Sequence, residues 1–187
     1  MTKVKFDPKK LSKLNNPDRL KTLNPDLIWD TLELQNPKIL IDIGAGTGFF
    51  AKEFSKKLDN GKIYACDSSD VMLQWMQENI TDKNIIPLKC SESSVELPNE
   101  IADLIYMLNV HHELLEPEAL LAEAFRLLKF GGKIAIIDWK PEEMQEGPPL
   151  ETRLSEEIVI EQLEKTPFRN ITKHKFLPQH WFIVGEK

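Results

Sequence analysis

The chain has 187 residues, of which 41% are apolar, and this is the size and composition of one ordinary globular domain with a sizeable core. Its formal charge of −6 and its isoelectric point near 5.3 argue against a general affinity for nucleic acid, because neutralising phosphates needs a basic surface. The two cysteines, Cys66 and Cys90, have neither the number nor the spacing of a disulfide framework or a zinc site, so we expect small buried side chains in a reducing compartment.

The amino-terminal part is locally basic and contains two similar helix starts. Seven basic and two acidic residues lie between Lys3 and Lys21, which is typical of a solvated helical face; the alternative is a surface that directs a protein or RNA substrate. The stretches "NPDRL" at 16–20 and "NPDLI" at 24–28 each offer an asparagine cap, a proline for the first turn and an aspartate that suits the helix dipole. We therefore expect two short helices here.

From residue 38 onward, strands alternate with helices. The expected elements are a strand at 38–44, a helix at 46–58, a strand at 62–67 and a helix from about Ser69 to Asn79. Phe50, Phe54 and Leu58 recur at spacing four, which gives the first helix one apolar face. Met72, Trp75 and Met76 do the same for the second helix.

The second half of the chain continues this alternation. The expected elements are a strand at 85–90, a strand at 102–110, a helix from Pro117 that stops at Gly131-Gly132, a strand up to Trp139, a helix from Ser155 to about Lys165, and two closing strands within 170–177 and 180–187. The continuous apolar run at 102–110 is typical of a strand buried on both faces. The pattern indicates an α/β fold with a mainly parallel sheet covered on both sides.

A glycine-rich turn joins the first strand to the first helix. In "DIGAGTG", 42–48, three glycines at alternate positions bare the backbone at the carboxyl end of a strand, where open sheets bind their ligands. The helix amino end offers free N–H groups, and Asp67 at the end of the second strand is placed to accept hydrogen bonds from both ribose hydroxyls of an adenosine-type ligand. A dinucleotide fingerprint needs its last glycine where Phe49 stands, which disfavours the alternative of a nicotinamide-dependent oxidoreductase.

Four segments follow one another at characteristic spacings: "DIGAGTG" at 42–48, "YACDSSDVML" at 64–73, "LPNEIADLIYMLNVHHEL" at 97–114 and "EAFRLLKFGGKIAIIDWKP" at 123–141. Together they resemble the class I S-adenosylmethionine-dependent methyltransferases, in particular the small-molecule enzymes called type 11 or ubiquinone-biosynthesis methyltransferases, with Phe130 in place of the family's usual proline. The resemblance runs from about residue 20 to the end of the chain. It implies a Rossmann-like, doubly wound, seven-stranded and mainly parallel sheet in the order 3-2-1-4-5-7-6 with an antiparallel last strand, and S-adenosyl-L-methionine as the cofactor.

The resemblance also assigns cofactor-binding residues. It places the methionine part and the ribose near Asp42, Gly44, Ala45, Gly46 and Gly48, the ribose hydroxyls on Asp67, the adenine beside Ser68 and Met72 with Ser91 and Glu92 as further candidates, and the methionine end opposite Asn109. The alternatives left open are a helix-capping role for Asp67, a core role for Met72 and another register of the loop at 90–96.

His111 and His112 follow the fourth strand at the edge of the expected substrate space. Their adjacent spacing is not that of a zinc helix, so we expect no metal. Either histidine can act as the general base for a hydroxyl or thiol acceptor; the alternative is that His112 and Glu113 stabilise the loop by hydrogen bonds. Trp139 is a candidate for an apolar site mouth, or else a packing residue.

The expected organisation is one domain, in which residues 1–36 form a helical segment that packs on the site and caps it, and residues 37–187 form the methyltransferase domain. Only the amino-terminal segment and the loop at 139–154 are long enough to cover a substrate, which suits a small-molecule acceptor with an O, N, S or C nucleophile, and no nucleic acid. The alternative is a non-catalytic S-adenosylmethionine-binding subunit that activates another methyltransferase. The apolar runs are too short and too often interrupted by charged residues to cross a bilayer, so we expect a cytoplasmic protein without a membrane partner. The oligomeric state stays open.

Overall fold

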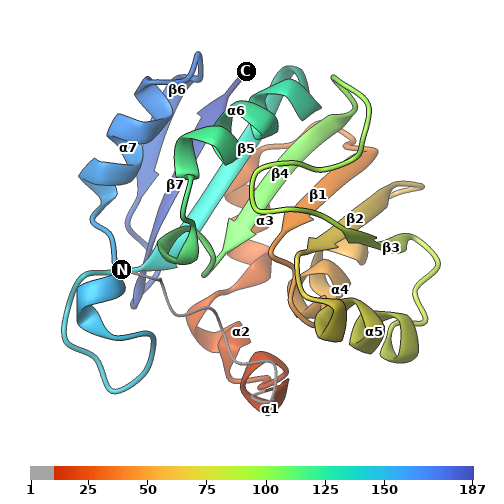
Figure 1. The fold of residues 1–187 in the computed structure, drawn as a ribbon, viewed down its shortest axis with the longest axis horizontal. Coiled ribbons are helices and arrows are strands. Elements are labelled where there is room, and N and C mark those ends of the chain that lie inside the picture. Colours follow the sequence, from red (N-terminus) through yellow and green to blue (C-terminus); the bar gives the residue numbers. More distant parts are fainter. Residues whose placement is uncertain (1–10) are drawn as a thin grey trace.

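The computed structural model describes residues 11–187, so the basic residues from Lys3 to Lys10 lie outside the described part of the chain. A seven-stranded sheet in the order β3-β2-β1-β4-β5-β7-β6 runs through the molecule (Figure 1). Its strands are β1 Ile39–Ile43, β2 Lys62–Asp67, β3 Ile85–Lys89, β4 Ala102–Leu108, β5 Leu128–Trp139, β6 Arg169–His174 and β7 His180–Glu186. β1 to β5 are parallel to one another, and β7 is antiparallel to both β5 and β6. The expected strand order is confirmed.

Helices cover both faces of this sheet. They are α1 Leu11–Leu14, α2 Arg19–Thr22, α3 Pro25–Leu32, α4 Phe49–Ser55, α5 Asp70–Asn79, α6 Pro117–Leu127 and α7 Glu156–Glu164, with short 3₁₀ turns η2 His111–Glu113 and η3 Leu150–Thr152. Successive strand residues point to opposite faces, so Leu40 packs toward α3, α4 and α5, whereas Ile41 packs toward α6 and α7. Figure 1 shows α6 and α7 in front of the sheet and α3 behind it.

The helix after the glycine turn is shorter than expected, because α4 covers Phe49–Ser55 and not 46–58. Gly46 and Gly48 have φ values of +57° and +70°, which lie in the left-handed region. A right-handed helix therefore begins only after Gly48.

The expected helix stop at Gly131-Gly132 is wrong. α6 ends at Leu127, and β5 begins at the next residue, Leu128, which pairs with Ala102 of β4. The register of the β4–β5 pair then shifts, and a Cβ on Gly132 would lie 3.0 Å from the Ala102 carbonyl oxygen. The two glycines therefore permit a bulge in a strand and do not end the helix.

The two asparagine caps behave differently. Asn24 caps α3 as expected, since its Oδ1 accepts from the backbone N–H groups of Asp26 and Leu27, both at 3.1 Å. Asn16 does not cap α2, which has Asp18 at its N-cap position. Its Oδ1 accepts from the Asp18 N–H at 3.0 Å and so holds the turn that precedes the helix.

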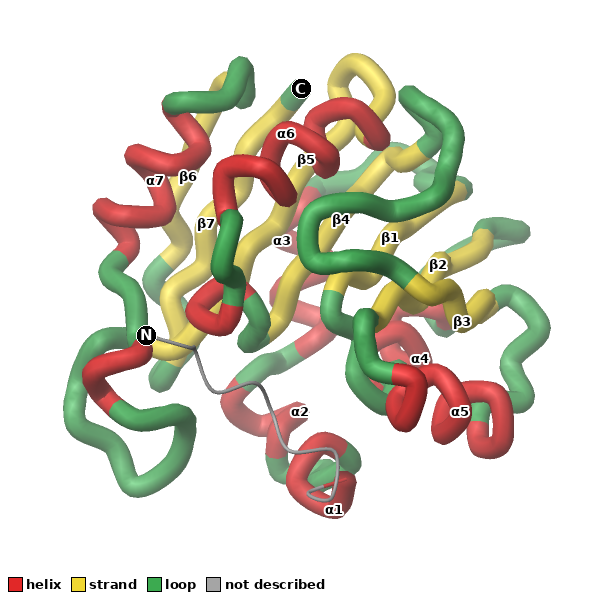
Figure 2. Tube along the Cα trace, in the orientation of Figure 1, coloured by secondary structure: helices red, strands yellow, loops and turns green. Residues whose placement is uncertain are grey.

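The carboxyl ends of β1, β2, β4 and β5 meet at one edge of the sheet, and α1, α2 and the loop at 140–153 lie at this end of the molecule (Figures 1 and 2). A side chain of α1, Leu14, comes within 3.3 Å of the place where a Cβ on Gly46 would lie. The Arg19 guanidinium lies 5.4 Å from the ring centroid of Phe49 and 4.9 Å from that of Phe50. The amino-terminal helices therefore pack directly on the glycine turn.

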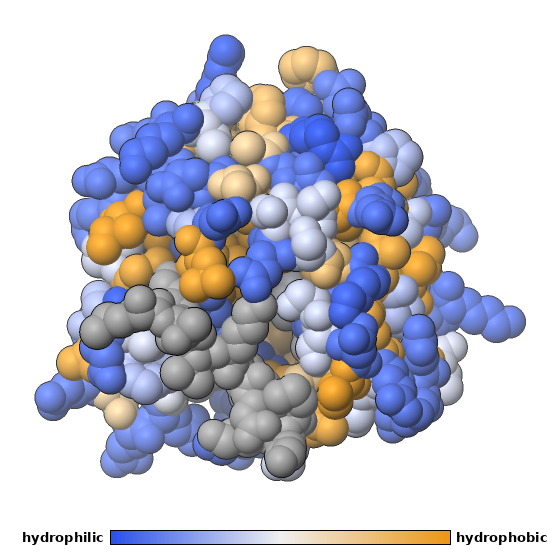
Figure 3. All heavy atoms as spheres, viewed as in Figure 1, coloured by the Kyte–Doolittle hydropathy of each residue, from blue (hydrophilic) through white to orange (hydrophobic). Residues whose placement is uncertain are grey.

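The face drawn in Figure 3 is mostly hydrophilic, and its apolar residues form small, separate patches. Within residues 11–187, no helix is long and apolar enough to cross a membrane.

Candidate active site

The glycine turn at 44–48 is held by the protein's own packing. The Gly44 N–H donates to the Cys66 carbonyl of β2 at 2.9 Å, which ties the turn to the neighbouring strand. A Cβ on Gly44 would lie 2.5 Å from Val110, and one on Gly48 would lie 2.5 Å from Ile80. Side chains of this chain therefore make the close approaches at these two glycines.

Asp67 ends β2, and its carboxylate joins two segments of the site. Its Oδ2 accepts from the Gly46 N–H at 2.8 Å, and its Oδ1 accepts from the N–H of Ser69, the N-cap residue of α5, at 2.8 Å. The residue is only 9% exposed. A carboxylate can accept about four hydrogen bonds, so this fixed orientation is compatible with ribose binding as well as with a capping role.

Asp42 is a buried carboxyl group at the end of β1, and its cross-strand neighbour is Tyr106 of β4. Burial raises the pKa of Asp42 to about 8; the negative charge of Asp67 raises it further, whereas Tyr106 and the Arg19 guanidinium oppose the rise. In the ligand-free protein, Asp42 therefore holds a proton over much of the acidic and neutral range.

This shift predicts an unusual pH dependence for Asp42→Asn. Because the folded-state pKa lies above the unfolded value, the protonated carboxyl stabilises the fold at low pH, and this contribution is lost as the pH rises toward 8. Asparagine resembles the protonated form at every pH. We expect the thermal midpoint of Asp42→Asn, relative to wild type, to increase from pH 4 to pH 8 by several degrees, with about 1 kcal/mol corresponding to ~2–4 °C.

The matched control is Asp103→Asn, for which we expect the opposite pH dependence of the thermal midpoint relative to wild type. Hydrogen bonds from Lys129 and from the backbone of Ile39 and Lys38 outweigh the effect of burial and lower the pKa of Asp103. Its ionised form is stabilising, and this contribution is lost as the pH falls. Thermal unfolding of the ligand-free proteins measures both effects, and a pH-independent difference between Asp42→Asn and wild type would contradict the prediction.

The proposed adenine-side residues lie in mixed surroundings. Met72 is buried, with an exposed fraction of 3%, and Ser68 is exposed. Ser91 is exposed too, and its hydroxyl donates to the Ser94 carbonyl at 3.3 Å within its own loop. Glu92 is half-buried. Ser68 and Met72 follow Asp67 closely in the sequence, whereas the Ser91 hydroxyl forms its hydrogen bond within its own loop.

Several buried polar atoms have no hydrogen-bond partner in the described part of the chain. They include Thr47 Oγ1 in the glycine turn and Asn109 Oδ1 after β4. Asn109 is held in the left-handed region at φ +59°, and its N–H donates to the Ile137 carbonyl at 2.8 Å. Buried polar atoms without partners are uncommon, and they indicate a place for water, an ion or a ligand.

The two adjacent histidines have different partners. His111 is fully buried, and its Nε2 lies 2.7 Å from Oε1 of Gln162 in α7. His112 places Nδ1 at 2.8 and 3.0 Å from the two carboxylate oxygens of Asp138, and its Nε2 lies 3.8 Å from Glu113 Oε1. Because a carboxylate only accepts, Nδ1 carries the ring proton and Nε2 is the basic nitrogen.

Four residues at this edge were not predicted as site residues from the sequence: Arg19, Thr47, Asp138 and His180. A signal existed for Asp138, since the strand segments 38–42, 62–67 and 133–138 all begin with Lys-Ile and end with Asp. Arg19 stands in a basic segment and His180 precedes an apolar strand, so neither has a local signal. Burial lowers the pKa of Arg19 to about 10, although Asp42 opposes the shift.

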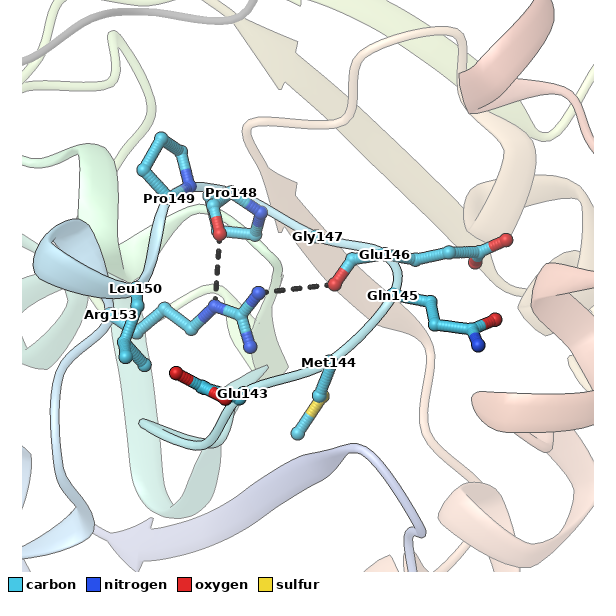
Figure 4. Close-up of a pocket in the computed structure, with 9 residues that line it drawn as sticks. All are labelled: Glu143, Met144, Gln145, Glu146, Gly147, Pro148, Pro149, Leu150 and Arg153. Atoms are coloured by element: carbon cyan, nitrogen blue, oxygen red, sulfur yellow. Dashed lines mark hydrogen bonds between the residues drawn. The ribbon is translucent and has the colours of Figure 1, made fainter.

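Arg153 organises the loop that follows β5. Its Nε donates to the Pro148 carbonyl at 3.0 Å, and a terminal nitrogen donates to the Glu146 carbonyl at 3.1 Å (Figure 4). The other terminal nitrogen donates to the Glu142 carbonyl at 2.7 Å, and the guanidinium lies 5.7 Å from the Trp139 ring. The loop surrounds a hollow of about 510 Å³, lined by Glu143, Met144, Gln145, Glu146, Gly147, Pro148, Pro149, Leu150 and Arg153. Hydrogen bonds to four backbone carbonyls, including that of Lys140 at 3.4 Å, and one ring contact make this loop a defined structure beside β5.

The sheet order, the left-handed glycine turn and the strand-end carboxylates define a Rossmann-like α/β protein. The family model of the methyltransferase domain matches residues 41–136, about half of the chain. The chain is also similar to a SAM-dependent methyltransferase from Aquifex aeolicus, with 34% identity, 97% of this chain and 98% of the other covered, and a TM-score of 0.91. The chain therefore belongs to the methyltransferase domain family of S-adenosylmethionine-dependent methyltransferases, as its resemblance implied.

Two further relatives show how far the similarity extends. A putative type 11 methyltransferase from Sulfolobus solfataricus has 25% identity and a TM-score of 0.68, with 80% of this chain and 83% of the other covered. The ubiquinone/menaquinone biosynthesis C-methyltransferase UbiE from Cupriavidus taiwanensis is 31% identical over 109 residues, which are 54% of this chain and 45% of UbiE. The match thus spans less than half the length of this curated relative.

Proposed function

We propose that the protein binds S-adenosylmethionine at the glycine edge and transfers its methyl group to a small molecule. The observation that carries the proposal is the pair of buried, unpartnered oxygens, Thr47 Oγ1 and Asn109 Oδ1, on the two segments that follow β1 and β4. Family membership favours this cofactor, and a relative whose chain is matched almost completely is named as SAM-dependent.

The residues at this edge fit the cofactor chemically. Asp67, whose carboxylate is held by the Gly46 and Ser69 N–H groups, is proposed to accept from the ribose hydroxyls, and Asp42, Thr47 and Asn109 are proposed to supply polar atoms for the amino-acid part of the ligand. The turn residues Gly44, Ala45, Gly46 and Gly48, whose N–H groups donate within the protein, are proposed to border the ligand. Ser68, Met72, Ser91 and Glu92 are the proposed adenine-side residues. When bound, S-adenosylmethionine supplies an electrophilic methyl group on a sulfonium sulfur.

The amino-terminal segment, residues 1–36, is proposed to cap this site. Leu14 approaches Gly46, and the Arg19 guanidinium lies over the rings of Phe49 and Phe50, so the described part of this segment, residues 11–36, packs on the glycine turn. This packing is proposed to exclude water from the ligand, which would strengthen the electrostatic contacts there.

His112 is the proposed general base for an acceptor that must lose a proton. Asp138 accepts the Nδ1 proton, and Nε2, which lies 3.8 Å from Glu113 Oε1, is the nitrogen proposed to take up the acceptor's proton. His111 is bound to Gln162, so we assign it a structural role in joining η2 to α7.

The non-catalytic alternative makes a different prediction about turnover. A subunit that only binds the cofactor keeps the glycine edge but needs no base, and the His112–Asp138 pair therefore favours the enzyme.

The test is calorimetric titration of the protein with S-adenosylmethionine and S-adenosylhomocysteine, followed by a search for acceptors that release S-adenosylhomocysteine. We expect micromolar binding of both ligands and turnover with a hydroxyl, thiol, amine or carbon-acid acceptor of small size. Binding without turnover across all four acceptor classes would favour the non-catalytic subunit, and no binding by the folded protein would contradict the proposal.

A further inference from the structure

His180 is a fully buried histidine whose imidazole has no hydrogen-bond partner. It begins β7, its exposed fraction is 0%, and both ring nitrogens lack a partner among residues 11–187. Buried polar groups are normally hydrogen-bonded, and leaving one without a partner costs free energy. A buried imidazole kept at this cost indicates a group that binds there only during function.

The imidazole lies at the same edge of the sheet as the glycine turn. His180 pairs with Trp139 in the β5–β7 ladder, and the two ring centroids are 4.3 Å apart with an angle of 44° between the rings. A Cβ on Gly147 would lie 3.0 Å from the indole, so the loop at 140–153 packs on the same tryptophan. The indole is therefore in contact with both the imidazole and the loop, and it remains half-buried.

Burial is the main influence on the protonation state of His180, and the surrounding charges modify it. Burial lowers the pKa of His180 to about 3; Asp138 opposes this shift, and the cations Arg19, Lys140 and Arg153 add to it. The ring is therefore neutral near pH 7, with one N–H donor and one bare nitrogen acceptor. Such a group cannot serve as a general base at this pH, but it can position a polar group by hydrogen bonding.

We propose that His180 and Trp139 form the binding subsite of the methyl acceptor, and that the acceptor places a hydroxyl group against the imidazole and a flat ring on the indole. The inference rests on the proposed function. A hydroxyl can donate to the bare nitrogen or accept from the N–H, whereas an ammonium can only donate. Asp138 brings a negative charge close to the imidazole, and Arg19, Lys140 and Arg153 bring three positive charges, which we expect to disfavour a cationic acceptor. His180 then binds the acceptor while His112 takes up its proton.

The first test compares thermal unfolding of the wild type and His180→Leu without ligand. Leucine removes both unpartnered nitrogens and keeps an apolar side chain of similar size, so we expect the midpoint to rise by about 2–4 °C. A histidine that served the fold would lower the midpoint when removed, and a clear fall would count against the subsite.

The second test uses phenol as a neutral hydroxyl probe and benzylammonium as a cationic probe, each titrated into protein saturated with S-adenosylhomocysteine and followed by NMR of the histidine ring nitrogens. We expect phenol to shift the His180 signals and to bind at least tenfold more weakly to His180→Leu, while the Kd for S-adenosylhomocysteine stays within twofold. His174→Leu removes the β6 histidine, whose Nε2 lies 3.2 Å from Thr172 Oγ1, and should bind phenol as the wild type does.

The outcomes separate this inference from the proposed function. Unchanged phenol binding by His180→Leu, or benzylammonium binding as tight as that of phenol, would overturn the acceptor subsite while the cofactor site stands. Failure of the wild type to bind S-adenosylhomocysteine would overturn the proposed function, and the acceptor subsite with it.

Discussion

Asp67→Ala is expected to weaken S-adenosylmethionine binding by about 100-fold or more. Hydrogen bonds to a charged group contribute about 1.5–3 kcal/mol each, and losing two bonds to the ribose amounts to roughly 3 kcal/mol, which is about two powers of ten in Kd. The substitution also removes the acceptor of the Gly46 and Ser69 N–H groups, so the turn itself loses an anchor. Calorimetric titration with S-adenosylmethionine measures the effect.

Two further variants separate ligand binding from local structure. Asp67→Asn keeps one carbonyl oxygen for the Gly46 N–H but loses the charge, and we expect an intermediate Kd. Asp70→Ala removes a carboxylate that pairs with Lys89 on the surface, and it should bind the cofactor as the wild type does. If Asp67→Ala, correctly folded by circular dichroism, binds within threefold of the wild type, Asp67 is a helix cap and no ribose ligand.

The sequence predicts those site residues that lie within a single recognisable segment, such as a strand end or a glycine turn. An apolar strand that ends in Asp42 and runs into alternate glycines, and a second strand that ends in Asp67, each form within a few residues of chain. The carboxyl ends of parallel strands meet at one edge, so the alternation of strands and helices was enough to bring these residues together.

The remaining features depend on contacts between distant segments. Only glycine fits at Gly44, because the Val110 side chain occupies the place of a Cβ. The Asp138 carboxylate accepts a hydrogen bond from His112, which lies 26 residues away in the chain. The β5 start at Leu128 follows from pairing with β4, which overrides the local preference of two glycines to end a helix. Each of these depends on strand register, and periodicity along one segment carries no information about it.

The protonation states of the site residues could not be predicted from the sequence either, because they depend on burial. The residue types of Asp42 and His180 suggest an ionised carboxylate and an imidazole that titrates near neutral pH. Burial instead raises the pKa of the first and lowers that of the second, so both are neutral in the ligand-free protein at pH 7. The edge therefore contains neutral polar groups whose partners come with the ligands.

Asp138→Asn is expected to lower kcat about 10²- to 10³-fold while leaving cofactor affinity within twofold. The Asp138 carboxylate receives the Nδ1 proton of His112 at 2.8 Å, and its Oδ2 also accepts from the His112 N–H at 2.9 Å. An asparagine can turn its amide donor toward Nδ1, which moves the ring proton to Nε2 and removes the base. General bases contribute about 10²–10⁴-fold, so the loss falls in this range.

The pH profile distinguishes loss of the base from loss of structure. With a base of histidine type, log kcat of the wild type should rise with slope 1 on the acid side and then level off, and Asp138→Asn should lose that plateau. His111→Gln removes a histidine bound to Gln162 outside the proposed chemistry, and it should lower the thermal midpoint with kcat unchanged. A wild-type kcat that stays flat from pH 5 to pH 9, together with full activity of Asp138→Asn, would mean that the acceptor needs no base and that the His112–Asp138 pair holds the loop in place.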